Sequence, residues 1–280
     1  MSQVHSQLTA FPEGVAEALL AGFGKWAFAV TGHGRLVKVN VESGSAEDLI
    51  VKTVTCTFQT PALIPGSIFS LYGNALADSP RVAPVPLPPE LDGVRVLADG
   101  EPMPLLSISP ARIWFQVPFQ LTDPGRLVRV ELEHPSPFDA CAAQRWVVRR
   151  QPYFFTDPSG DAVIAHGDFH GLVAANDPAR PREVIHAYMV GLGPVMPEMP
   201  TGVTTPTDRL FRLEDDFGCR LGNQTLEIPF AGLAPGFIGV YQVSVRLPDT
   251  LPSPRFYLDC GFPDDRSHRA GVWVPTAPAP

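Results

Sequence analysis

The sequence contains two similar stretches, "PGSIFSLYGNALA" at residues 65–77 and "PREVIHAYMVGLG" at residues 181–193, which lie 116 positions apart. When they are superposed, proline, apolar and aromatic residues match in pairs: Pro65 with Pro181, Ile68 with Val184, Phe69 with Ile185, Tyr72 with Tyr188, and Leu76 with Leu192. An internal repeat of this kind predicts that the chain contains two copies of one structural unit.

Two further elements recur in the same order. The alternating stretch "IWFQVP" at residues 113–118 is echoed by "YQVSVRLP" at residues 241–248, and Gly222-Asn223 stands where the first copy has Asp99-Gly100. An Asp-Gly pair between alternating apolar runs is a strong signal for a β-hairpin. The offset between the copies grows to 130 positions because the second copy is longer around residues 196–218.

The composition and the alternation together predict an all-β fold. The chain has 32 prolines and 24 glycines in 280 residues, with only 18% charged residues. This composition disfavours long helices and favours short strands joined by turns. Strict alternation over strands of this length is typical of an Ig-like β-sandwich. The alternation predicts which side chains point into the core. In the first copy these are Ile113, Phe115 and Val117, and in the second they are Tyr241, Val243, Val245 and Leu247.

We therefore expect a short β-meander at residues 1–54, a first Ig-like sandwich at 55–153 and a second at 154–280. All three lysines fall within the first 52 residues, which indicates a change of module near residue 55. The stretch "GKWAFAVTGHGRLVKVNVESGSAEDLI" at residues 24–50 alternates between strand-like runs and glycine turns. It resembles a single blade of an NHL-like propeller, although a hairpin packed on the next domain is an equally good interpretation.

Four motifs carry a resemblance to a known family: "PGSIFSLYGNALA", "PMPLLSISPARIWFQVPFQL", "YMVGLGPVMPEMPTG" and "FAGLAPGFIGVYQVSVRLP". They resemble the uncharacterised Solibacter-type C-terminal domain, a tandem β-sandwich module reminiscent of IPT/TIG immunoglobulin-like units. The resemblance covers residues from about 55 to 275. It implies a position behind another module in a secreted or cell-surface protein, and it brings no catalytic residues or cofactor with it.

Charge and hydropathy exclude several partner classes. The net charge is −8 and the sequence has no basic run, so nucleic acid is not an expected partner. No apolar run approaches the roughly 20 residues of a membrane helix, and the first residues lack the pattern of a signal peptide. A protein or a glycan on a surface is the expected partner. The oligomeric state and the native start of the chain stay open.

We expect a non-catalytic module with a spacer, adhesion or binding role, because the sequence contains no G-x-S-x-G motif and its histidines imply no nucleophile partner. The alternative is a carbohydrate-binding accessory module of a secreted hydrolase. Its platform would be Trp114, facing outward between Arg112 and Gln116. Packing of Trp114 against the neighbouring repeat is the competing interpretation. Trp146 and the aromatic run at residues 153–155 are expected in the junction between the repeats.

A candidate metal site lies in "HGDFHG" at residues 166–171. His166, Asp168 and His170 would share one face of an extended segment, and two imidazoles with a carboxylate suit zinc or a similar ion. The spacing indicates no fourth ligand, so a solvated turn is the alternative. A metal-dependent enzyme built on these residues is the third and weakest functional hypothesis.

The four cysteines divide two to each repeat and include no C-x-x-C motif, which disfavours zinc ribbons and thioredoxin-like chemistry. The repeat boundary favours bridges from Cys56 to Cys141 and from Cys219 to Cys260. Each would join the first strand of a sandwich to its last and stabilise it by roughly 3 to 5 kcal/mol in the chain-entropy model. Buried free thiols are the alternative.

Overall fold

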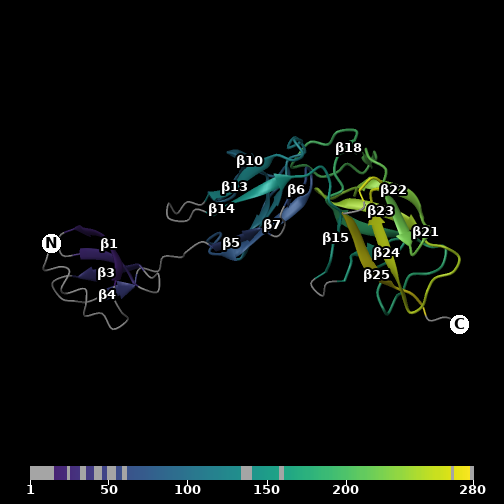
Figure 1. Ribbon diagram of the computed structural model, residues 1–280, viewed down its shortest axis with the longest axis horizontal. Coiled ribbons are helices and arrows are strands. Elements are labelled where there is room, and N and C mark those ends of the chain that lie inside the picture. The colour runs from purple at the N-terminus through teal and green to yellow at the C-terminus, as the bar shows by residue number, and fades with distance from the viewer. Residues whose placement is uncertain are drawn as a thin grey trace. The chain divides into compact units, whose positions relative to one another are not determined.

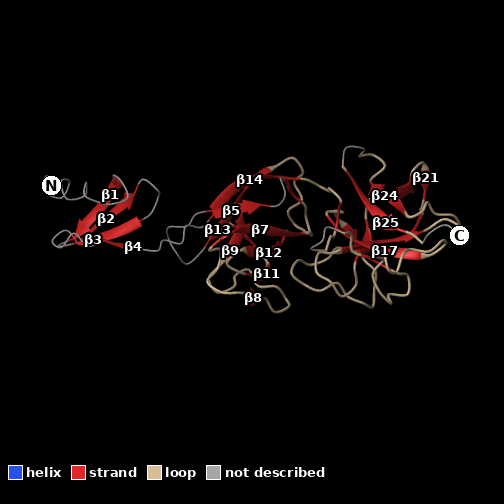
Figure 2. Cartoon of the chain, turned by 90° about the horizontal axis from the view of Figure 1, so that it is seen from below, coloured by secondary structure: helices blue, strands red, loops and turns tan. Residues whose placement is uncertain are grey.

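The computed structural model describes the backbone of residues 16–23, 26–31, 36–40, 46–48, 55–58, 62–133, 141–157, 161–265 and 268–277, with side chains from residue 57 onward. Every regular element within these ranges is a β-strand (Figure 2). The predicted all-β class, with two Ig-like sandwiches after a short β-meander, is confirmed. The chain divides into two compact units, Met1–Thr53 and Val54–Pro280.

The first unit contains one antiparallel sheet whose strands pair in sequence order. They are β1 (Ala16–Phe23), β2 (Trp26–Thr31), β3 (Leu36–Asn40) and β4 (Ala46–Asp48). Strands that pair only with their sequence neighbours form a meander. A propeller blade is also a four-stranded sheet, so the arrangement is compatible with the blade resemblance, which stays a prediction.

The second unit begins with a two-sheet sandwich (Figure 1). Its first sheet pairs, in spatial order, β5 (Thr55–Phe58), β7 (Ile68–Asn74), β12 (Arg112–Gln116), β11 (Leu105–Ile108) and β8 (Arg81–Val82). Its second sheet pairs β10 (Glu101–Met103), β9 (Arg95–Ala98), β13 (Leu127–Glu133), β14 (Cys141–Val147) and β6 (Ala62–Leu63). Ile113, Phe115 and Val117 are fully buried between the sheets, as their alternation predicts.

A second sandwich completes this unit. One of its sheets pairs β15 (Tyr153–Phe154), β17 (Val184–Val190), β23 (Tyr241–Arg246), β22 (Glu227–Leu233), β19 (Arg212–Leu213) and β18 (Val195–Met196), and β16 (Ile164–Ala165) also pairs with β17. The other pairs β21 (Gln224–Thr225), β20 (Gly218–Leu221), β24 (Arg255–Gly261) and β25 (Arg269–Pro275). The inward residues expected in the second copy are buried here: Tyr241, Val243 and Val245 on β23, and Leu247 directly after it.

Both sandwiches have the strand order of an immunoglobulin-like fold, in which strands A, B, E and D face strands C, F and G. In the first, β5, β7, β12 and β11 take the places of A, B, E and D, and β9, β13 and β14 those of C, F and G. In the second, β15, β17, β23 and β22 face β20, β24 and β25. The two matching stretches of sequence thus form strand B of each copy, β7 and β17.

In the first sandwich, an Asp-Gly turn forms the hairpin that connects strand C, β9, to its neighbour β10. Asp99 and Gly100 have φ of 49° and 87° and link Ala98 to Glu101, which are directly paired. Positive φ at both central residues defines the type I′ turn, whose twist matches that of the flanking strands. The Asp99 carboxylate also accepts a hydrogen bond from the backbone N–H of Arg129, at 2.7 Å. This bond is the leading cause that lowers the pKa of Asp99.

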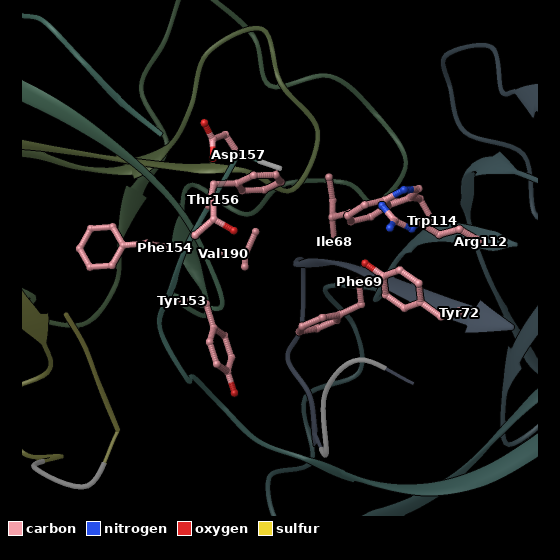
Figure 3. A pocket seen from close by; sticks show the side chains of 11 residues that line it. Ile68, Phe69, Tyr72, Arg112, Trp114, Tyr153, Phe154, Thr156, Asp157 and Val190 are labelled. Atoms are coloured by element: carbon pink, nitrogen blue, oxygen red, sulfur yellow. The ribbon is translucent and has the colours of Figure 1, made fainter. Parts of the chain in front are cut away.

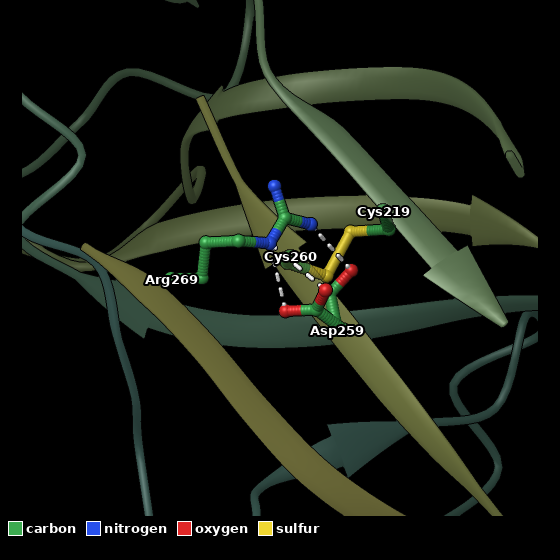
Figure 4. The surroundings of a disulfide bond; sticks show 4 residues. All are labelled: Cys219, Asp259, Cys260 and Arg269. Atoms are coloured by element: carbon green, nitrogen blue, oxygen red, sulfur yellow. Dashed lines mark hydrogen bonds and ion pairs between the residues drawn. A yellow bond between two sulfur atoms is a disulfide. The ribbon is translucent and has the colours of Figure 1, made fainter. Parts of the chain in front are cut away.

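A disulfide joins Cys219 on β20 to Cys260 on β24 (Figure 4). The two cysteines are directly opposite one another on neighbouring strands of one sheet, so the bridge links strands C and F. The expectation that it would join the first and last strands of the second copy is wrong. Cys141 on β14 is also disulfide-bonded. The side chain of Cys56, its expected partner, lies outside the described residues.

The two sandwiches meet through a buried polar junction. The side-chain amide of Gln116 donates to the carbonyl oxygen of Gly66 at 2.9 Å and accepts from the N–H of Gly202, in the second sandwich, at 2.8 Å. Ser67 Oγ accepts from the N–H of Gly191 at 2.8 Å. Gly191 has a φ of 81°, and a Cβ there would lie 2.0 Å from the carbonyl oxygen of Gln151, so only glycine fits this crossing.

Candidate functional site

A cleft with a volume of about 660 Å³ lies between the two sandwiches (Figure 3). The first sandwich contributes one wall from the paired strands β7 and β12. The second contributes the other from the segment around β15 and the end of β17. The first wall consists of Ile68, Phe69, Tyr72, Arg112 and Trp114, and the second of Tyr153, Phe154, Phe155, Thr156, Asp157 and Val190.

Strand register places the polar and aromatic groups of the first wall together. Arg112 is directly opposite Tyr72, and Trp114 lies two residues further along β12 on the same face. The guanidinium of Arg112 lies over both rings, 4.2 Å from the Tyr72 centroid and 5.4 Å from that of Trp114. Cation–π contacts at exposed sites are worth about 0.5–1 kcal/mol. The result is a connected aromatic surface with a bidentate donor above it.

Three consecutive aromatic residues, 153–155, form much of the second wall, and each packs against a different hydrophobic cluster. Tyr153 packs against the first core, Phe154 against the second, and Phe155 against a small cluster between them. The Phe155 N–H donates to the carbonyl oxygen of Tyr188 at 2.9 Å, which fixes the segment against β17. Burial raises the pKa of Tyr153 and of Tyr188, so both phenols stay protonated at neutral pH.

Trp114 has both roles that the sequence left open. It packs against the cluster between the sandwiches, formed by Ile68, Ala234 and Val240, and it also lines the cleft. The tryptophan is half-buried, so one part of the indole supports the junction while another faces the cleft. Arg112 is exposed, as expected.

Two expectations about this region are wrong. Gln116 does not flank an exposed platform: it is only 1% exposed, because its amide is used in the junction. Trp146 does not form a buried core between the repeats either, since it is 52% exposed on β14. Alternation alone could not reveal that the outer face of β12 is covered at one end by the second sandwich.

The "HGDFHG" segment forms a turn, so the expected extended arrangement is wrong. Phe169, at its centre, has a φ of 58°. The imidazole of His166 is fully buried, whereas His170 and Asp168 are exposed. Asp168 hydrogen-bonds Nδ1 of His170, and this bond, followed by one from Asp177, raises the pKa of His170. Asp168 does not join the two histidines in a common ligand set.

Several residues of each site were not predicted from the sequence. They include Tyr72 and Asp157 in the cleft, and Asp177 and Glu183 beside the histidines. A signal for Tyr72 existed, because it and Tyr188 match in the internal repeat and lie on the same strand in each copy. Asp177 and Glu183 come from the long connection after β16, whose path no local pattern predicts.

The described residues include no helix long and apolar enough to span a bilayer. No protein-family model matches the chain, and no curated protein sequence matches it either. The Solibacter-type resemblance therefore has no support from a family model. Fold and cleft together define a tandem Ig-like β-sandwich protein.

Solved structures with similar folds are distant. SGBP-B of the mixed-linkage glucan utilization locus of Bacteroides ovatus, in complex with a mixed-linkage heptasaccharide, is 10% identical with a TM-score of 0.37. The match covers 92% of this chain and 54% of that one, so the chain spans about half of that protein. The titin I-band fragment I67–I69 is 8% identical, with a TM-score of 0.23 and coverage of 93% and 84%. The mouse nectin-like molecule 4 ectodomain is 10% identical, with a TM-score of 0.18 and coverage of 87% and 72%. Likenesses of this degree do not bear on function.

Proposed function

We propose that the protein is a non-catalytic binding module whose ligand occupies the cleft between the two sandwiches. The aromatic surface of Tyr72 and Trp114 beneath the Arg112 guanidinium carries this proposal. Small-molecule sites are typically concave, mostly apolar and aromatic, and contain a few placed polar groups. The cleft, at about 660 Å³, lies within the usual range of ligand-site volumes.

The ligand class that fits the cleft best is a carbohydrate. A sugar ring presents an apolar face of C–H groups, which an indole or phenol ring can cover, and a rim of hydroxyl groups. Arg112 supplies several N–H donors on one wall, and Asp157, whose Oδ1 also accepts from the Asp161 N–H, places a carboxylate on the other. The role is that of a carbohydrate-binding accessory or surface module, and the cleft would hold a short segment of a polysaccharide.

Binding of a panel of soluble oligosaccharides and polysaccharides, measured by calorimetry and affinity electrophoresis, tests this proposal. We expect Trp114→Ala to weaken binding by at least about tenfold, the effect of losing a central aromatic anchor. Trp146→Ala removes an equally large exposed side chain away from the cleft and should leave the affinity unchanged. If Trp114→Ala binds as tightly as the parent protein, the cleft is not the site. If no glycan binds the parent, the ligand class is wrong.

A second candidate function is adhesion to a protein. Tyr257 and Trp273 are a directly paired couple on β24 and β25, with ring centroids 5.2 Å apart, and both are about half exposed. The Arg255 guanidinium lies 4.6 Å from the Trp273 centroid. Paired aromatics beside an arginine are typical of interface hot spots. Partner capture that is lost in Trp273→Ala but kept in Trp114→Ala would favour this candidate.

We also propose that the protein works outside the cytoplasm. The Cys219–Cys260 bridge supports this, because structural disulfides form and persist in oxidising compartments. The motifs of the Solibacter-type resemblance, with two Ig-like units in tandem, support the same location. Thiol titration of the unfolded protein, prepared from an oxidising expression compartment with and without reductant, tests it. Four free thiols in unreduced material would contradict the proposal.

A further inference from the structure

Two histidines of the second sandwich direct the same ring nitrogen toward one carboxylate. Nε2 of His166 lies 3.3 Å and Nε2 of His170 lies 2.8 Å from Oδ2 of Asp177. These three atoms all lie within 4.8 Å of one another. The two imidazole rings are stacked, with centroids 4.4 Å apart and an interplanar angle of 22°, and both Nε2 atoms lie beside the same carboxylate oxygen. Asp177 lies seven residues after His170 in the sequence, and the intervening chain folds back so that its carboxylate contacts both histidines.

The other nitrogen of each ring is held by a separate carboxylate. Nδ1 of His166 is 2.6 Å from Oε1 of Glu183, and Nδ1 of His170 hydrogen-bonds Oδ1 of Asp168. Glu183 is itself fixed, since its carboxylate accepts from the N–H groups of Gly167 and Arg180 at 3.3 and 2.9 Å. In metal-binding histidines, a carboxylate on Nδ1 keeps the proton there and leaves the lone pair of Nε2 for the metal, and the carboxylates of Glu183 and Asp168 are placed to do this.

The surroundings of His166 Nε2 contain acceptors only. Besides Oδ2 of Asp177, the carbonyl oxygen of the same residue lies 3.2 Å away. The ring is completely buried, so water does not complete its hydrogen bonding. With Nδ1 donating to Glu183, Nε2 faces two oxygen acceptors, so this position favours a positive charge there, either a proton on Nε2 or a metal ion. The second oxygen of Asp177 is occupied by Arg180 at 2.8 Å, which leaves Oδ2 directed at the histidines.

We propose that His166 Nε2, His170 Nε2 and Asp177 Oδ2 bind one transition-metal ion of the zinc class. Zn–N and Zn–O bonds of about 2.0 to 2.2 Å at tetrahedral angles place neighbouring ligand atoms about 3.3 Å apart. The His166–Asp177 separation already has this value, and His170 needs to move outward by only about 0.5 Å. His170 is exposed, so it can make this movement and turn its ring out of the stack with His166. The described residues supply three ligands.

The ligand chemistry selects the metal. Imidazole nitrogens suit zinc, copper and nickel, whereas calcium requires six to eight oxygen ligands. The ion would tie the turn at residues 166–171 to the loop that carries Asp177, and so brace the start of the second sandwich. The site shares no residue with the cleft, so the two proposals stand or fall independently.

The test is a titration of the tag-free, chelator-treated full chain with zinc, monitored by competition with a chromophoric chelator, and with cobalt, monitored by its visible absorption. We expect one ion per chain and no competition by calcium. His170→Ala should weaken zinc binding by at least about 100-fold, and Asp168→Asn by about 10- to 100-fold, because Asp168 holds the proton on Nδ1 of His170. His268→Ala, another histidine paired with an aspartate, is the matched control and should bind normally.

His170 is chosen because its side chain is exposed, and its replacement should leave the fold intact, whereas His166 is part of the buried structure. Circular dichroism of each variant in chelator checks this. The parent protein provides a measurement that needs no variant: zinc should raise its melting temperature. Absence of stoichiometric zinc in the parent overturns the proposal. So does an affinity that His170→Ala leaves unchanged or that His268→Ala lowers equally. Trp114→Ala should retain full zinc binding whatever its effect on glycans.

Discussion

At the scale of single residues, Gln116 shows how one side chain couples the two sandwiches. It lies at the end of β12, where one more polar residue on an alternating strand would ordinarily face water. Its amide instead satisfies the Gly66 carbonyl in its own sandwich and the Gly202 N–H in the next. Because both backbone groups are buried, the amide supplies the hydrogen bonds that water would otherwise make to them.

We expect Gln116→Leu to destabilise the protein by about 2 to 4 kcal/mol, since it leaves a buried donor and a buried acceptor unpaired at about 1 to 3 kcal/mol each. Urea unfolding followed by fluorescence measures this loss. Gln144→Leu, on an exposed position of β14, makes the same chemical change and should alter the free energy of unfolding by less than about 0.5 kcal/mol. Equal effects of the two variants would show that the amide bridge contributes nothing.

At the scale of strands and sheets, the Cys219–Cys260 bridge joins strands that are already hydrogen-bonded neighbours. The bridge closes a loop of 41 residues, for which the chain-entropy model gives about 4 kcal/mol. Beside it, Arg269 of β25 forms an ion pair with Asp259 at 2.8 Å (Figure 4). Side-chain links therefore join β20 to β24 and β24 to β25, in addition to the backbone hydrogen bonds of the sheet.

Replacing both cysteines by alanine should lower the free energy of unfolding of the second sandwich by about 2 to 4 kcal/mol, through greater freedom of the unfolded chain. Chemical denaturation under non-reducing conditions checks this. An Asp259→Asn variant, which weakens only the neighbouring ion pair, should lose less than about 1 kcal/mol. A double alanine variant as stable as the parent protein would contradict the expectation.

Elements were more predictable than sites, because local patterns encode strands but not the approach of distant loops. Alternation and the Asp99-Gly100 turn were sufficient for the hairpins and for the inward set Ile113, Phe115 and Val117. Trp114 was recognisable from its place on a strand. Asp157, on the opposite wall of the cleft, and the third metal-ligand candidate, Asp177, lie on connections whose course depends on the packing of the whole second unit.

At the scale of the whole second unit, the junction is held by charge as well as by the Gln116 amide. Arg149, in the connection after β14, pairs with Glu214 at 2.8 Å and with Asp215 at 3.0 Å. The neighbouring Arg150 binds the same Asp215 and also Asp264. Two arginines of the connection are thus fixed by carboxylates from separate loops of the second sandwich. The cleft depends on this junction, because its walls belong to different sandwiches.

The junction should weaken in acid. The hydrogen bond from Arg149, followed by the one from Arg150, holds the pKa of Asp215 below its usual value of 3.8, against the opposing effect of burial. A carboxyl with a lowered folded-state pKa contributes stability that is complete above about pH 4 and is lost as the pH falls through the folded-state pKa. We expect the melting temperature of the second unit to decrease when the pH is lowered below about 4, and we expect Asp215→Asn to reduce that dependence.

Asp249→Asn, at an exposed ion pair with Arg182, is the control and should leave the pH profile unchanged. Calorimetric scans between pH 6 and pH 3 measure all three proteins, and equal profiles for the parent and Asp215→Asn would show that this carboxylate does not couple the sandwiches.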